Sequence, residues 1–253
     1  MQENPPVNSR VIHQRKNVTN QLKQWANSFS GCDGGTPESD IWLCGIEWGY
    51  EAATDEERYE YYKNGLPKEI NSGEQKLDTT YDFFTDESME FPFNLAFAKI
   101  FSALKNTEIS DITDKILKLN LSPIAFRKDD DSLWGENLSK ATGFDTKAKF
   151  IEYLNGLNRF EEITRTYSPK LIVCIGNGYR ANFKNSFFGN NEIQFKGELI
   201  KPEDSNKNQN NRYMYHTKIN DTLMVVTPFS TSQNGLNSDY LLKKVGEKIK
   251  DLL

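Results

Sequence analysis

The chain has 253 residues, of which 37% are hydrophobic and 12% aromatic, enough to bury the core of one large domain. It contains no apolar run of about eighteen residues, and residues 1–15 lack the apolar stretch of a secretory signal, so we expect neither a membrane span nor secretion. The formal net charge of −5 argues against a broadly basic nucleic-acid-binding surface, although phosphate binding needs only a local basic face.

Cysteines and histidines are scarce and widely spaced. Cys32, Cys44 and Cys174 are accompanied only by His13 and His216, too few ligands for a disulfide framework or for a four-ligand zinc site. We therefore expect no metal, no cofactor and a reducing environment, the cytoplasm.

Predicted helices and strands alternate along the chain. Apolar residues recur at helical spacing, and short apolar runs are typical of buried strands. The predicted helices cover 11–29, 92–104, 150–163 and 240–249, and the predicted strands cover 41–46, 116–121, 171–175 and 222–227. Such alternation indicates βαβ units, so we expect an α/β fold with a central four-stranded parallel sheet.

Two polar segments interrupt this pattern. Residues 51–90 carry twelve acidic and four basic side chains, and residues 187–218 are rich in Asn and Lys. We interpret both as insertions within a single domain, 1–253, and the second as a hairpin. The acidic segment should repel phosphate, and it offers a surface for a protein partner.

Polar side chains follow the predicted strands where each one ends. Glu47 follows the first strand, Asn120 ends the second, Gly176 follows the third, and Thr227 to Ser230 follow the fourth. Ligands of open parallel sheets bind at the carboxyl ends of the strands. A carboxylate, a carboxamide and a hydroxyl-rich loop are therefore expected to meet at one cleft.

The order of these residues resembles the uracil-DNA glycosylase superfamily over residues 40–250. Gly45-Ile46-Glu47-Trp48-Gly49 is similar to the family's first motif, with Trp where the family has Pro. Asn120 stands where the middle strand of the family ends in an Asn that recognises the base.

The later motifs are similar as well. Ile175-Gly176 resembles the family's glycine turn, and Thr227-Pro228 stands where the family has His-Pro or Asn-Pro. Gly235-Leu236-Asn237 resembles the segment that carries the family's Leu wedge. The resemblance implies a three-layer α/β/α fold that binds DNA.

The resemblance also implies hydrolysis of a base–sugar bond in DNA. Cleavage builds positive charge on the sugar and negative charge on the base. Glu47 would orient water and stabilise the cation, Thr227 or backbone N–H groups of its loop would donate to the leaving base, and Asn120 would recognise the base edge. Because no lysine lies within these motifs, we expect no lyase step.

Further residues are implied in binding. The substrate-binding set also contains Gly45, Ile46, Trp48 and Ser230, and the DNA-binding set contains Gly176, Asn177, Ser232, Leu236 and Asn237. Leu236 would fill the gap left by the flipped base, and a base-stacking ring would come from Trp48, Tyr50, Phe91 or Phe93.

The rim of this cleft departs from what a tight uracil pocket needs. Trp48 and the long first connection favour a modified pyrimidine, such as a hypermodified cytosine in bacteriophage DNA, which would make the protein a defence glycosylase. Structural alternatives remain open: Glu47 as a solvated side chain, Asn120 as a turn cap before Pro123, and Leu236 as a core residue.

Two other functions compete with this interpretation. Thr227 and the acidic segment fit a catalytically silent member of the fold that binds DNA or a protein. Gly176-Asn-Gly-Tyr-Arg-Ala181 fits the Gly-x-Gly-x-x-Ala pattern of dinucleotide-binding oxidoreductases, although it follows the third strand and not the first.

Overall fold

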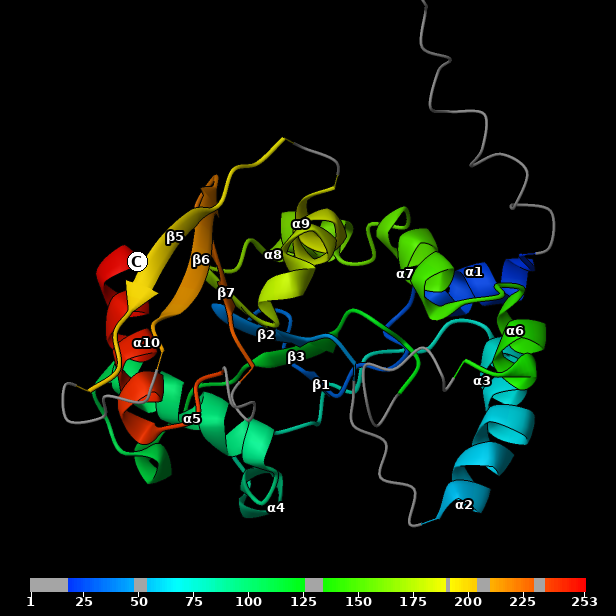
Figure 1. Cartoon of the computed structure of the whole chain (residues 1–253), viewed down its shortest axis with the longest axis horizontal. Helices are drawn as coiled ribbons and strands as arrows, with labels where there is room; N and C mark the ends of the chain where they lie inside the picture. The colour runs from blue at the N-terminus through cyan, green and yellow to red at the C-terminus, as the bar shows by residue number, and fades with distance from the viewer. Residues whose placement is uncertain (1–17, 48–53, 126–133, 190–191, 204–209, 230–234) are drawn as a thin grey trace, which may run out of the picture.

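The sheet contains seven strands and is mixed (Figure 1). A computed structural model describes residues 18–47, 54–125, 134–189, 192–203, 210–229 and 235–253. The strands, which lie in the order β1-β3-β2-β4-β7-β6-β5, are β1 (Gly34–Gly35), β2 (Ile41–Gly45), β3 (Leu117–Asn120), β4 (Leu171–Ile175), β5 (Lys196–Ile200), β6 (Arg212–Ile219) and β7 (Thr222–Thr227).

The predicted α/β class is confirmed, but the sheet is larger than predicted. β2 pairs in parallel with β3 and β4, and β4 pairs in parallel with β7. β1, β6 and β5 join in antiparallel fashion at the two sides. β5 and β6 form an antiparallel pair, as the predicted hairpin in 187–218 requires. Their joining to the central sheet was not predicted, because exposed residues break their apolar runs, and β1 was not predicted because it is two glycines.

Helices occupy most of the remaining described chain. They are α1 (Asn20–Ala26), α2 (Asp55–Glu60), η3 (Tyr61–Gly65), α3 (Leu66–Ser72), α4 (Asp86–Met89), α5 (Pro92–Lys105), η4 (Ile109–Asp111), α6 (Glu136–Thr142), α7 (Lys147–Asn155), α8 (Glu161–Tyr167), η6 (Asn177–Tyr179), α9 (Arg180–Phe188) and α10 (Asp239–Leu252). No helix in the described part of the chain is long and apolar enough to cross a membrane.

The helix predicted over 150–163 is two helices. α7 ends at Asn155, Gly156 follows it, and Asn158 adopts a positive φ of 50°. A left-handed residue cannot continue an α-helix, so the chain turns before α8 begins at Glu161.

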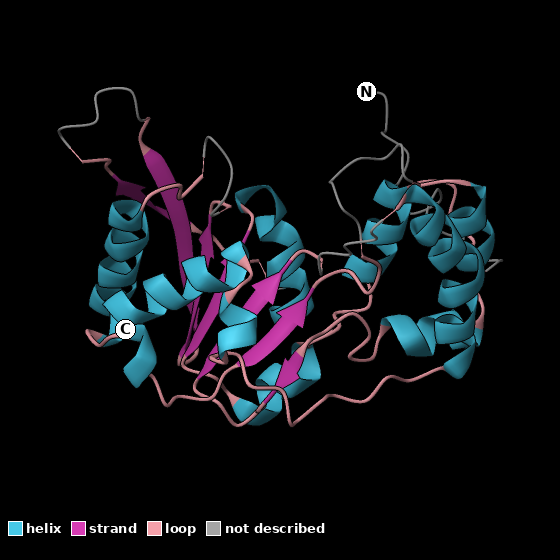
Figure 2. Cartoon of the chain, turned by 90° about the horizontal axis from the view of Figure 1, so that it is seen from below, coloured by secondary structure: helices cyan, strands magenta, loops and turns pink. Residues whose placement is uncertain are grey.

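Helices cover both faces of the sheet (Figures 1 and 2). α5 and α10 pack on one face, where Leu43 and Val173 lie in the core, and α8 and α9 pack on the other, against Leu117 and Leu119. Side chains alternate between faces along a strand, so Lys118 and Asn120 lie on the α5 side of β3.

A third apolar cluster lies beside the sheet, at the right of Figure 1. It joins α1, η3, α3, α6 and α7, which we call the helical lobe. Tyr62, Leu66 and Ile70 are buried in this cluster, so the acidic 51–90 segment supplies core residues. The other polar segment, 187–218, includes the antiparallel β5 and most of β6.

Candidate functional site

The carboxyl ends of β2 and β4 form the topological switch point of the sheet. From β2 the chain continues to β3 on one side, and from β4 it continues to β5, β6 and β7 on the other, the arrangement that opens a crevice in α/β sheets. Two backbone bonds extend the pairing of β2 with β3, from Leu121 N–H to Gly45 O at 3.0 Å and from Ser122 N–H to Ile46 O at 2.7 Å. Glu47 follows directly.

Glu47 forms an ion pair with Lys147. The Glu47 Oε2 to Lys147 Nζ distance is 3.3 Å, and the two side chains are 13% and 4% exposed. Lys147 begins α7, whose first turn is capped by Thr146. The sequence-based expectation considered only the strand-end motifs, and it missed this lysine 100 positions away.

The Asn120 carboxamide is buried beside the end of β2. Its Nδ2 donates to Gly31 O at 2.7 Å and to Asp33 Oδ2 at 3.1 Å. A Cβ on Gly45 would lie 2.5 Å from Asn120 Oδ1, so glycine is needed there. With both amide hydrogens engaged, Asn120 presents an acceptor and no donor.

A polar network continues from Asn120 along the α5 face of the sheet. Lys118 Nζ donates to Asp33 Oδ1 at 3.0 Å and to Asn94 Oδ1 at 3.1 Å. It also lies 5.7 Å from the centroid of the Phe93 ring. Phe93, one of the predicted stacking rings, is therefore near Lys118, whereas Phe91 is exposed.

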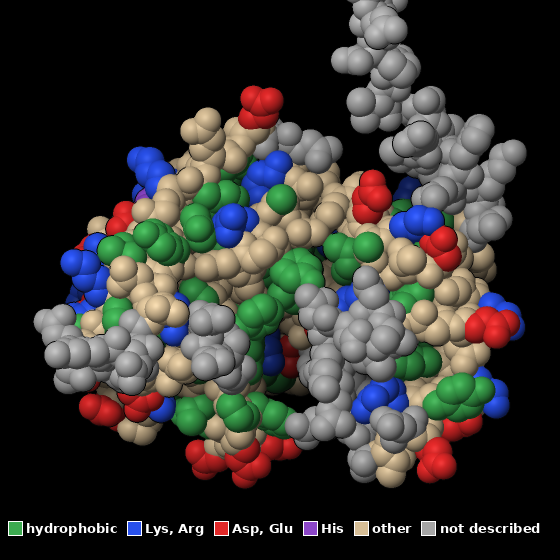
Figure 3. Space-filling view, viewed as in Figure 1, with side chains coloured by type: hydrophobic (Ala, Val, Ile, Leu, Met, Phe, Trp, Pro, Cys, Tyr) green, Lys and Arg blue, Asp and Glu red, His purple; other side chains and the backbone are tan. Residues whose placement is uncertain are grey.

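Figure 3 shows a hollow between the sheet and the helical lobe, with acidic and basic side chains inside it. The pKa of Tyr81 is affected by Asp33 of this polar network. Burial raises the pKa of its hydroxyl to about 12, with further contributions from the charges of Asp33 and Asp82. The negative charge of Asp33 thus extends beyond its ion pair.

Two predicted site residues lie in the core. Thr227 is fully buried, and its hydroxyl donates to Cys174 O at 3.4 Å, because β7 has neighbours on both sides and helices over both faces. Leu236 is buried against α5 and α10. In this structure neither side chain faces the crevice, while the neighbouring Phe229 is exposed.

Gly176 and Asn177 lie at the switch point, as their place after β4 requires. Gly176 has a φ of 127°, and a Cβ there would lie 2.7 Å from Ile46 Cδ1. Asn177 Nδ2 donates to Tyr213 O at 2.7 Å. Asn237 is exposed. The predicted residues Trp48, Tyr50, Ser230 and Ser232 lie outside the described residues.

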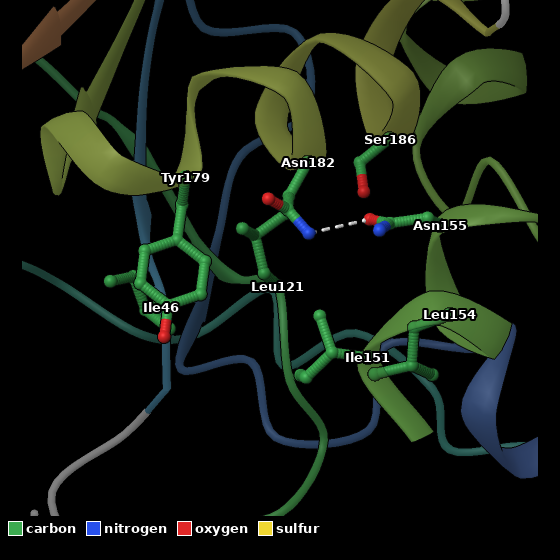
Figure 4. Close-up of a pocket in the computed structure, with 8 residues that line it drawn as sticks. All are labelled: Ile46, Leu121, Ile151, Leu154, Asn155, Tyr179, Asn182 and Ser186. Atoms are coloured by element: carbon green, nitrogen blue, oxygen red, sulfur yellow. Dashed lines mark hydrogen bonds between the residues drawn. The ribbon is translucent and has the colours of Figure 1, made fainter. Parts of the chain in front are cut away.

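A small pocket opens beside this point (Figure 4). Ile46 and Leu121 from the strand ends meet Ile151 of α7, and Asn182 Nδ2 of α9 donates to Asn155 Oδ1 at 3.0 Å. The pocket has an apolar floor and an amide pair, and it adjoins the segment that carries Glu47.

Arg159 holds the end of β3 in place through hydrogen bonds to backbone carbonyls. The sequence did not predict this role. Its guanidinium donates to the carbonyls of Asn120, Leu121, Ser28 and Ser30 at 2.7–2.9 Å. Burial lowers the pKa of this guanidinium. A lone arginine between two helices carries no sequence signal for such a role, because its four acceptors are backbone carbonyls.

Comparison with protein-family models, with curated proteins and with solved structures found no match. Among the described residues, no group of three or more His, Cys, Asp or Glu side chains could hold a metal ion. The residues at the switch point form the candidate functional site.

Proposed function

We propose that this protein is a monofunctional DNA glycosylase that hydrolyses the N-glycosidic bond of a pyrimidine. The observation that carries the proposal is the position of Glu47, whose carboxylate is held by Lys147 at the carboxyl end of β2. Asn120 ends the neighbouring parallel strand. A carboxylate and a base-recognition group at the carboxyl ends of two neighbouring parallel strands fit the chemistry of base excision.

The proposed reaction breaks the bond between the base and the C1′ of the sugar, and its electrons leave with the base. Water adds to C1′ and loses a proton. Glu47 orients this water and stabilises the cationic sugar. Thr227 is turned into the core, so backbone N–H groups are the better donors to the leaving base.

The hydrogen bonds of Asn120 support a modified cytosine over uracil. Its remaining acceptor, Oδ1, and the partly exposed Asp33 carboxylate suit a hydrogen-bond donor on the base. The N4 amino group of cytosine offers two hydrogens to these two acceptors, whereas uracil offers a single N3–H beside carbonyl oxygens that the acceptors would repel. A hypermodified cytosine in bacteriophage DNA belongs to this class.

The test is mass spectrometry of bases released from oligonucleotides that contain uracil, cytosine or hydroxymethylcytosine. We expect release of a cytosine-type base, and turnover at least about tenfold lower in Glu47→Gln, equivalent to about 1.4 kcal/mol of barrier. EDTA should not change the rate, and borohydride should trap no protein–DNA adduct, because the amine of Lys147 is engaged by the Glu47 carboxylate. Preferential release of plain uracil would contradict the substrate class, and unchanged turnover in Glu47→Gln would contradict the role of the carboxylate.

The second candidate is a catalytically silent protein of this fold that binds DNA or a protein. The buried Glu47–Lys147 pair and the core position of Thr227 favour it, because both groups already have partners within the protein. DNA binding without base release would support this candidate. A thermal shift with NAD(P) would instead favour the dinucleotide-binding alternative at Gly176–Ala181.

A further inference from the structure

Exposed aromatic rings gather next to the switch point. Tyr213 is 50% exposed and Phe229 is 43% exposed. Phe229 follows the carboxyl end of β7, while Tyr213 is near the start of the antiparallel β6. Both rings therefore lie at the edge of the sheet that holds the carboxyl ends of β2 and β4.

Two contacts connect the segments that carry these rings to the residues that follow β4, one to Asn177 and one to Gly176. Asn177 Nδ2 donates to Tyr213 O. Phe229 Cζ lies 3.5 Å from the position that a Cβ on Gly176 would occupy, and Ile46 Cδ1 lies 2.7 Å from the same position. Phe229 and Ile46, which precedes Glu47 in the chain, therefore both lie next to Gly176.

A fixed arginine completes this surface. The Arg180 Cζ lies 4.0 Å from the centroid of the Tyr215 ring, and Arg180 Nη1 donates to Asn177 O at 2.6 Å. Tyr213 and Tyr215 share one face of β6 because side chains alternate along a strand. We call Tyr213, Tyr215, Phe229 and Arg180 the aromatic face.

The charge near the aromatic face suits a polyanion. Residues 171–189 contain Arg180 and Lys184 and no acidic residue. The acid-rich 51–90 segment contributes instead to the helical lobe, which lies on the opposite side of the switch point from β6 (Figure 1).

We propose that the aromatic face binds single-stranded DNA and leads it to the switch point. Bases stack on Tyr213 and Phe229, and a phosphate lies near Arg180. Proteins that hold single strands combine aromatic stacking with positive charge in this way. Bases within a duplex are stacked on each other and cannot stack on protein rings. The excision of a base from the bound strand rests on the proposed function, whereas the binding of the strand does not.

The test measures binding separately from catalysis. Fluorescence anisotropy is recorded with a labelled thymine-only single strand, with the same strand in a duplex, and with a uracil-only RNA of equal length. Tyr213→Ala and Phe229→Ala should each weaken single-strand binding at least about fivefold. Tyr213→Phe should retain it, and Arg180→Gln should lower the salt dependence of binding.

Tyr167→Ala is the matched control. Tyr167 is 40% exposed, but it ends α8 and precedes β4, at the opposite edge of the sheet, so its variant should bind as the parent does. Equal affinity of the parent and both alanine variants would overturn the proposal, as would tighter binding of the duplex or of the RNA. Single-strand binding that depends on both rings, without base release, would support the aromatic face and refute the glycosylase.

Discussion

The buried ion pair of Glu47 and Lys147 should contribute to the stability of the folded protein. Both side chains are largely removed from water, and breaking a buried pair leaves an uncompensated charge. We expect Lys147→Met to lower the free energy of unfolding by at least about 2 kcal/mol, measured by urea denaturation.

The control for this change is a double-mutant cycle. Glu47→Gln removes the partner charge, so the double variant should be more stable than Lys147→Met alone. Additive losses across the cycle would show that the two side chains do not interact. Base release by the same four proteins would then separate the structural role of the pair from its proposed catalytic role.

Tyr81 gives a test of the polar network by pH. The pKa of its hydroxyl is raised to about 12 in the folded state, against about 10 in an unfolded chain. Folding therefore favours the neutral phenol, and this contribution is complete below pH 10 and lost as the pH rises towards 12.

Phenolate absorbance should show a late titration that Tyr81→Phe reduces but does not abolish, because burial also raises the pKa of Tyr153. Asp33→Asn should move that step to lower pH, because one of the negative charges that raise the pKa is removed. A Tyr81 that titrates at about pH 10 in the native protein would contradict the burial of the network.

At the scale of elements, Gly246 fixes how α10 crosses α5. A Cβ at this position would lie 2.3 Å from Ile100 O and 2.7 Å from Ala103 Cβ. Helix propensity favours alanine over glycine by about 1 kcal/mol, but overpacking costs about 1–3 kcal/mol and backbone atoms cannot yield locally. We expect Gly246→Ala to be destabilising in thermal unfolding.

Gly178→Ala is the control, since a Cβ there meets nothing within 4 Å. Its effect on unfolding should be small. A stabilised Gly246→Ala variant would mean that propensity outweighs packing, and that α5 and α10 are further apart than this structure places them.

The strands differ in how well their sequences predict them. The four predicted strands are buried along their whole length, and such strands produce continuous apolar runs. β6 alternates Arg212, Tyr213 and Met214 between buried and exposed positions, and β1 consists of two glycines. Burial on both faces was therefore predictable, whereas β1 and the pairing of the 187–218 hairpin with β7 were not.

In the molecule as a whole, the acidic segment contributes buried residues to the apolar cluster of the helical lobe. Tyr62, Leu66 and Ile70 are buried there, and each contributes about 1.5–3 kcal/mol. Their sum approaches the total stability of a typical domain, about 5–15 kcal/mol. Deleting residues 55–72 should therefore unfold the helical lobe.

Tryptophan fluorescence and limited proteolysis measure this change, because Trp25 and Trp134 belong to the same core. The control neutralises exposed charges instead: Glu56→Gln with Glu74→Gln should leave both measurements unchanged. An intact fluorescence spectrum and protease resistance after the deletion would show that the segment is an independent attachment.

Local patterns by themselves determined the α/β class, the four central strands and the placement of Glu47, Asn120 and Gly176 at strand ends. These follow from the spacing of apolar residues, which reports burial within one element. Local patterns do not reveal that Lys147 faces Glu47, that Asp33 and Gly31 accept from Asn120, or that Thr227 points into the core; these depend on how the chain packs. Such contacts join positions up to 100 residues apart, and their geometry depends on strand order and helix packing, which no short stretch of sequence encodes.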